Sequence, residues 1–168
     1  MKSNVAMFFF GILLLSGTAY AQAVLAADKK IVLEGKFGKE QSEQTVKPGY
    51  GPELGQKVRV DQLTSGDPEW NGSNITVYEH SVSHPTAGTY AIYGVLSAPG
   101  GDKAYLEFAG KWDVVMKEGK FAEAPFSAEG KVVGGSGKLE KMTGKVRQSG
   151  KVVAGEGGRY SIEITTDR

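Results

Sequence analysis

The stretch Ala104-Tyr-Leu-Glu-Phe-Ala-Gly-Lys-Trp-Asp-Val114 decides the fold, because its apolar residues recur at every second position. Side chains of a β-strand point alternately to opposite faces, so this period predicts a strand with one face in the core and one in water. The predicted inner face carries Ala104, Leu106, Phe108, Gly110, Trp112 and Val114. The other face is mostly polar and has Tyr105 as its one large aromatic residue.

Seven further segments show the same period, and the chain after residue 27 has no helical period longer than two turns. We predict strands over 31–37, 57–63, 74–83, 89–96, 122–132, 145–153 and 159–165, with Val58 and Val60 pointing inward. Antiparallel sheets bury one face in this way, and eight such strands can close into a barrel without exposed edges. The sequence therefore predicts an all-β fold: a single small antiparallel β-barrel of about eight strands. A two-sheet sandwich is the alternative.

Glycine makes up 24 of the 168 residues, and it recurs before a lysine and an apolar residue. This phrase begins at Gly35, Gly110, Gly119, Gly130, Gly137, Gly144 and Gly150. We expect glycine to permit a turn, bulge or bend there, lysine to face water, and the apolar residue to return to the core.

Two polar segments interrupt the strand pattern. The segment 38–56 contains Pro48-Gly-Tyr-Gly-Pro52 and predicts a long loop. The segment 65–72 contains Gly66-Asp-Pro68 and Asn71-Gly72, which are typical of turns, and is expected to link the second and third strands.

The first residues resemble a targeting segment. Lys2 precedes an apolar run from Phe8 to Leu15, and small residues follow. This predicts a signal peptide over 1–23, cleaved after Ala21 or Ala23, with Ala27 as the latest limit, and a barrel domain over 24–168. The run is shorter than the roughly 20 residues of a membrane span, although an uncleaved anchor is the alternative. We therefore expect an exported protein, periplasmic or secreted.

Composition limits the partners. The chain has 20 basic and 19 acidic side chains with no basic block, which argues against nucleic acid as a partner. It has no cysteine, so packing and sheet hydrogen bonds must hold the fold. Nothing in the sequence indicates a cofactor.

The run Gly134-Gly-Ser-Gly-Lys-Leu-Glu-Lys-Met-Thr-Gly144 resembles a glycine-rich segment of allene oxide cyclases and dirigent proteins. In that superfamily the segment joins two late strands of an eight-stranded antiparallel barrel. The neighbouring strands 129–133, 145–147 and 159–165 agree in order. The resemblance implies a barrel with an apolar pocket and allows for a trimer. The family's polar pocket residues have no matching positions here, so no activity is implied.

Aromatic residues on predicted strands are the best material for a ligand pocket. The candidate ligand-binding residues are Tyr78, His80, Tyr93, Phe108, Trp112, Phe126 and Tyr160, to which Tyr90 adds a further ring. If the face of 74–83 that carries Tyr78 and His80 is the inner one, these two form the polar end of the pocket. The alternative is that the aromatic rings fill the barrel, because eight strands leave room for side chains or for one small ligand.

Other candidate chemistry is weaker. His80 and His84 would lie about 13 Å apart on a strand, too far for one zinc ion, so no metal site is predicted. Asp61, Asp67 and Glu69 could supply a carboxylate pair, but Asp67 before Pro68 is simpler as a turn residue. No catalytic residue is identified.

Three functions stay open. The first is a non-enzymatic exported barrel that binds a small hydrophobic or aromatic molecule in its interior. The second is a cofactor-independent isomerase or cyclase, which would need a buried His, Glu or Asp inside the barrel. The third is a structural or oligomeric interaction module that uses the outer sheet face, for which Tyr105 is the hint.

Overall fold

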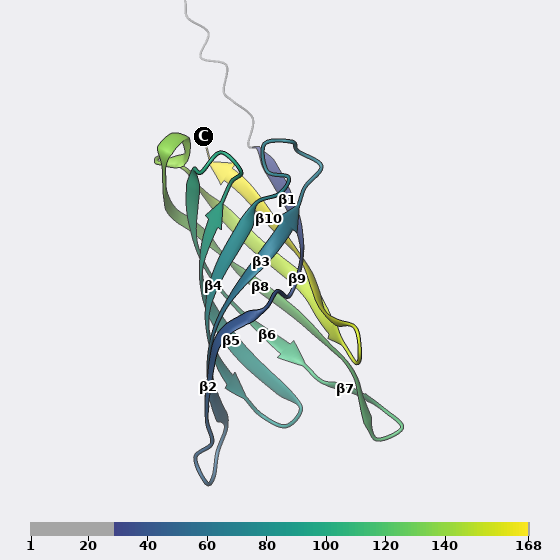
Figure 1. Cartoon of the computed structure of the whole chain (residues 1–168). Helices are drawn as coiled ribbons and strands as arrows, with labels where there is room; N and C mark the ends of the chain where they lie inside the picture. Colours follow the sequence, from purple (N-terminus) through teal and green to yellow (C-terminus); the bar gives the residue numbers. More distant parts are fainter. Residues whose placement is uncertain (1–28, 168) are drawn as a thin grey trace, which may run out of the picture.

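The chain from residue 29 to residue 167 forms a closed antiparallel β-barrel in the computed structural model, which describes these residues (Figure 1). The predicted signal peptide lies outside them. The strands of the barrel domain are β1 Lys30–Lys36, β2 Glu40–Val46, β3 Glu53–Thr64, β4 Asn74–Ser83, β5 Ala87–Ser97, β6 Lys103–Asp113, β7 Val115–Lys117, β8 Lys120–Ser136, β9 Thr143–Val153 and β10 Gly157–Asp167.

Eight strands form the ring, in the order β1-β10-β9-β8-β6-β5-β4-β3, and β1 pairs with β3 to close it. That closing pairing is short, with Glu34 opposite Thr64 and Gly35 opposite Leu63. β2 and β7 lie outside the ring, on the edges of β3 and β8. The all-β class and the barrel are confirmed, and the sandwich alternative is wrong.

The two ends of the barrel differ. The turns at 84–86, 118–119 and 154–156, together with the β2–β3 turn at 47–52, lie at one end, which we call the hairpin end (Figure 1). The loop 65–72 lies at the other, capped end, where Trp70 is buried against the core. The predicted turn chemistry of this loop is confirmed, because the Asp67 carboxylate accepts a hydrogen bond from the Glu69 N–H at 3.0 Å.

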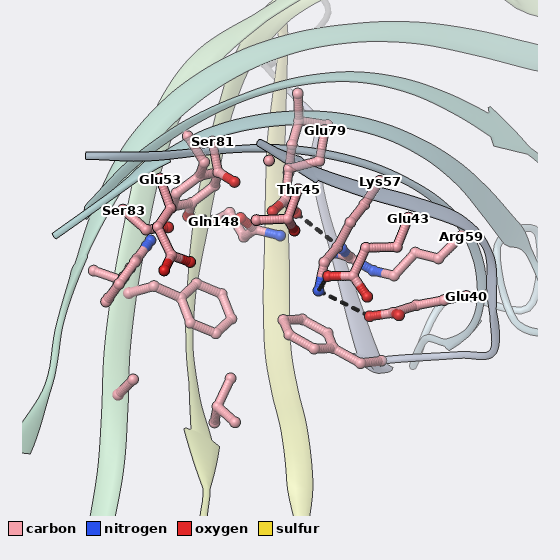
Figure 2. Close-up of a pocket in the computed structure, with 18 residues that line it drawn as sticks. Glu40, Glu43, Thr45, Glu53, Lys57, Arg59, Glu79, Ser81, Ser83 and Gln148 are labelled. Atoms are coloured by element: carbon pink, nitrogen blue, oxygen red, sulfur yellow. Dashed lines mark hydrogen bonds and ion pairs between the residues drawn. The ribbon is translucent and has the colours of Figure 1, made fainter. Parts of the chain in front are cut away.

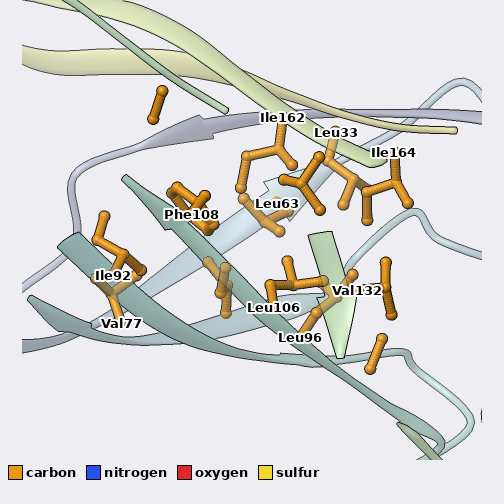
Figure 3. Packing of buried hydrophobic residues seen from close by; sticks show 14 of the residues in the cluster. Leu33, Leu63, Val77, Ile92, Leu96, Leu106, Phe108, Val132, Ile162 and Ile164 are labelled. Carbon is orange, nitrogen blue, oxygen red and sulfur yellow. The ribbon is translucent and has the colours of Figure 1, made fainter. Parts of the chain in front are cut away.

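A packed core fills the capped half of the barrel (Figure 3). Its members alternate along their strands with outward residues: Leu33, Leu63, Ile75, Leu96, Leu106, Val132, Val146, Ile162 and Ile164 are all nearly fully buried. The alternation predicted for 104–114 is confirmed, because Ala104, Leu106 and Phe108 point inward.

Two details of the predicted strands are wrong. The segment 38–56 is not a long loop, because it contains β2 and the start of β3. All seven residues of β2 are exposed, so no core-facing period marks it. In 57–63 the inner face carries Arg59, Asp61 and Leu63 rather than Val58 and Val60. A buried ion pair takes the inner positions there.

At four of the seven phrases the glycine makes no turn, and its position inside a strand agrees with the predicted strand ranges. Gly35, Gly110, Gly130 and Gly150 lie within strands, not in turns, and each faces an inward aromatic ring across the strand pair. Their partners are Tyr160, Tyr90, Phe108 and Phe126 respectively. At Gly35 and Gly150 the ring lies so close that a methyl group would overlap it, so these two positions need the absence of a side chain.

The glycine-rich run of 134–144 ends β8, makes a short 3-10 turn at Gly137–Leu139 and leads into β9. It therefore joins two late strands of the barrel. Within residues 29–167 no helix has the length and hydropathy to cross a membrane.

Candidate functional site

The hairpin half of the barrel contains a cavity of about 310 Å³ (Figure 2). Strands β2, β3 and β4 give it one side, which we call the charged wall: Glu40, Glu43, Glu53, Lys57, Arg59 and Glu79. Strands β5, β6, β8 and β9 and the residue after β1 give the other side, which we call the aromatic wall: Phe37, Tyr90, Ile92, Trp112, Ala124, Phe126 and Val152. The cavity is therefore apolar on one side and ionic on the other.

A buried ionic network separates the cavity from the packed core. Arg59 donates from Nε to Asp61 at 3.0 Å and from Nη1 to Glu79 at 2.9 Å. Asp61 also accepts hydrogen bonds from the Tyr160 hydroxyl at 2.6 Å and from the Gly38 N–H at 2.7 Å. Both oxygens of a carboxylate with no exposed surface are thus satisfied, as burial of a charge requires.

The guanidinium of Arg59 is held between ions and an aromatic ring. Its central carbon lies 4.3 Å from the centroid of the Phe37 ring, a distance at which a cation is attracted to the ring face. Burial alone would lower the pKa of Arg59, but Asp61 and Glu79 outweigh it and raise this pKa. Arg59 is therefore a fixed positive charge in the floor of the cavity.

Lys57 makes the second ionic group of the charged wall. Its amine lies 2.9 Å from Glu40 and 3.1 Å from Glu43, so β2 is attached to β3 through side chains as well as through the strand ladder. Burial alone would lower the pKa of Lys57, but the two carboxylates outweigh it and raise this pKa. The hydrogen bond from Lys57 in turn lowers the pKa of Glu40.

The aromatic wall is built over inward glycines. The indole of Trp112 lies on Gly88, where a methyl group would overlap it, and a methyl group at Gly150 would lie 2.7 Å from the Phe126 ring. Phe126 stacks on Phe37 with a centroid separation of 5.6 Å and meets Tyr90 edge to face at 6.2 Å. These contacts fix a continuous apolar surface.

Tyr90 and Gln148 bring polar atoms into this wall. The Tyr90 hydroxyl donates to Gln148 Oε1 at 3.0 Å, and both residues are buried. Burial raises the pKa of Tyr90 above its ordinary value, and the negative charge of Glu79 adds to the effect. Tyr90 is therefore a neutral hydrogen-bonding group.

The structure divides the candidate ligand-binding residues between the two faces of the sheet. Trp112 and Phe126 line the cavity. Phe108 and Tyr160 point inward but are packed in the core cluster. Tyr78, His80 and Tyr93 lie on the outer face, with Tyr78 43% and Tyr93 41% exposed. The inner face of β4 carries Glu79 and Ser81, so the condition for Tyr78 and His80 to form the polar end of a pocket is not met.

The other candidates separate in the same way. Asp61 is buried inside the barrel, whereas Asp67 and Glu69 lie in the loop at the capped end and bind Lys29 at 3.0 Å and 2.9 Å. They do not form a pair with Asp61. Across residues 29–167 no group of three His, Cys, Asp or Glu side chains is arranged to hold a metal ion.

The sequence reasoning missed most of the charged wall. The signal was present in 57–61, where Lys57, Arg59 and Asp61 alternate with Val58 and Val60. An alternation of charged and apolar residues gives the two faces but not which of them is inside. Glu40 and Glu43 were missed with the strand that carries them.

Comparison of the chain with protein-family models, with curated proteins and with solved structures finds no match in any of the three. The relationship to allene oxide cyclases and dirigent proteins therefore stays a prediction. The candidate site rests on its own geometry.

Proposed function

We propose that this protein binds a small organic molecule in the cavity of the hairpin half of the barrel. The observation that supports this most directly is the division of the cavity into an aromatic wall and a charged wall. Small-molecule sites are typically apolar clefts of about 300–1,000 Å³ with a few placed polar groups, and the cavity of about 310 Å³ lies at the lower end of that range.

The ligand's apolar body would lie against Trp112 and Phe126. Both rings are half-buried, so each leaves surface that a ligand can cover. The packed core on the far side of Arg59 and Asp61 has no such space, because its side chains are nearly fully buried. Binding is therefore assigned to one half of the interior only.

Native mass spectrometry of the protein purified from its own organism tests this proposal. We expect an additional small-molecule mass, which the variant Ala124→Phe should lose because Ala124 lines the cavity. Ala109→Phe is the matched control, because Ala109 lies on the outer face of β6. Equal retention of the mass by the two folded variants, or no bound mass on the wild type, would contradict the proposal.

Association through the outer face is a second candidate function, favoured by a row of tyrosines on that face, of which Tyr78 and Tyr93 are exposed and Tyr105 is half-buried. Tyr78 lies 6.3 Å from Tyr93, and Tyr93 lies 6.5 Å from Tyr105, measured between ring centroids. Tyrosine is enriched at protein interfaces. Light scattering after size-exclusion chromatography would test for a homo-oligomer that Tyr93→Ser weakens, and a monomer at every concentration would contradict it.

Export stays part of the proposal on the strength of residues 1–23. We propose that the mature barrel is periplasmic or secreted and that it is a relative of the allene oxide cyclase and dirigent barrels. Support comes from the glycine-rich segment 134–144. N-terminal sequencing of the protein from its own organism would test the cleavage after Ala21 or Ala23.

A further inference from the structure

The cavity holds more negative than positive side chains. Four glutamates line it, Glu40, Glu43, Glu53 and Glu79, against the two cations Lys57 and Arg59, so the formal charge of the lining is 2 − 4 = −2. Asp61, buried directly behind Arg59, adds a further negative charge. A cleft lined with an excess of one sign, with low-dielectric walls, concentrates ions of the opposite sign.

The two cations of the lining are already committed to carboxylates. Arg59 binds Asp61 and Glu79, and Lys57 binds Glu40 and Glu43. Glu53 has only Lys47 as an ionic partner among the described residues, in a pair whose side chains are 69% and 46% exposed. Neither cation is therefore available to pair with an anionic ligand. The carboxylates outnumber the cations, so they can still pair with a cationic ligand.

Gln148 brings a hydrogen-bonding amide to the cavity. It is only 4% exposed and its Oε1 accepts a hydrogen bond from Tyr90. Among the described residues the fully buried side-chain polar atom without a partner is Trp70 Nε1, so the Nε2 of Gln148 is not an orphaned buried donor. The residue comes from β9 and lines the cavity together with the labelled residues of the charged wall (Figure 2). Because the side-chain amide has two donor hydrogens besides its acceptor oxygen, its Nε2 is a group that a bound molecule in the cavity can use.

We infer that the ligand is an organic cation: a flat aromatic body against Trp112 and Phe126, and an ammonium-type group facing Glu43, Glu53 and Glu79. A hydrogen-bond acceptor on the same molecule would accept from the Nε2 of Gln148. This inference rests on the proposed function and specifies its ligand. The aromatic faces contribute to it, because a ring attracts a cation placed over it.

Calorimetric titration with three probes of one shape tests the charge requirement. The probes are naphthylmethylammonium, naphthylmethanol and naphthoate. We expect the ammonium to bind about tenfold tighter than the alcohol, and the carboxylate to bind most weakly, since one charge contact in a partly solvated site is worth on the order of a factor of ten or more. The preference should shrink at high salt, where partly exposed charges are screened.

Glu53→Gln, a rim residue without a role in the buried network, should reduce the preference for the ammonium over the alcohol severalfold. Glu129→Gln, on the outer face of β8, should leave it unchanged. Equal affinity for all three probes would overturn the charge inference and still support a binding cavity. Tightest binding of naphthoate would also overturn it, and binding of none of the three would contradict the proposed function itself.

Discussion

Replacing Arg59 with methionine should destabilise the barrel by several kcal/mol. The substitution keeps much of the side-chain length and removes the guanidinium that binds Asp61 and Glu79. Asp61 has no exposed side-chain surface and Glu79 has 18%, so both would lose their cation in a site that water hardly reaches. Breaking such a buried pair typically costs about 3–5 kcal/mol, a large share of the roughly 5–15 kcal/mol that stabilises a domain.

Urea unfolding of the mature chain, followed by circular dichroism, measures this loss. With a slope of about 2 kcal/mol per molar urea, the midpoint should fall by about 2 M. Arg147→Met is the matched control, because its pair with Glu129 spans 3.4 Å between side chains that are 71% and 79% exposed. Such a surface pair contributes about 0–1 kcal/mol. If Arg59→Met costs no more than Arg147→Met, the buried network does not stabilise the inner face of β3.

Three further predictions concern the inner surface. Gly88→Ala should cost about 1–3 kcal/mol of unfolding free energy, because the new methyl overlaps the indole of Trp112. Gly66→Ala is the control and should be near neutral, because the space around Gly66 is open. Equal thermal midpoints of the two variants would contradict this prediction. Tyr160→Phe should cost about 1.5–3 kcal/mol in urea unfolding, because it removes a hydrogen bond to a buried carboxylate; a loss below about half a kcal/mol would count against that bond. Lys57→Met should cost up to about 1 kcal/mol at neutral pH. Because Lys57 lowers the pKa of Glu40 from 4.5, this contribution is present above pH 4.5 and is lost as the pH falls further, so urea midpoints of the two proteins should converge in acid. A constant difference down to pH 3 would refute the coupling.

The barrel itself could be predicted because its capped half obeys one rule. Along β6 every inward residue is apolar or glycine, and along β10 Thr166 is the exception, so the period of two gives the strands, their faces and the all-β class together. The short turns and the absence of a helical period complete the prediction of an antiparallel all-β barrel. In this part of the sequence the local preference of each segment for a strand agrees with the position of that strand in the barrel.

The charged wall of the hairpin half could not be predicted because it breaks that rule, whereas Trp112 and Phe126 of the aromatic wall follow it. Arg59 and Asp61 occupy inner positions, and contacts with Glu79 and Tyr160, which come from β4 and β10, help to make their burial tolerable. Those contacts join residues 20 and 99 positions apart, which no local pattern records. The inner and outer faces of β3 were therefore exchanged in the prediction, which placed Val58 and Val60 inside.

β2 was missed for a related reason. It lies outside the ring and buries no side chain, so its sequence Glu40-Gln-Ser-Glu-Gln-Thr-Val46 has no apolar period. β2 can be recognised only from its pairing with β3. The aromatic partners of the strand glycines were also missed, since a sequence does not show which ring lies across the sheet from a given glycine.

The most direct test of a barrel that is packed in one half and ligand-binding in the other is the response of its isoleucine methyl groups to a ligand. All five described isoleucines belong to the core cluster, but Ile92 also lines the cavity, whereas Ile31, Ile75, Ile162 and Ile164 do not. In methyl-labelled protein titrated with naphthylmethylammonium, the account predicts a saturable shift of the Ile92 resonance with little change at the other four. Shifts confined to the other four isoleucines, or an unmoved Ile92 at saturation, would contradict it.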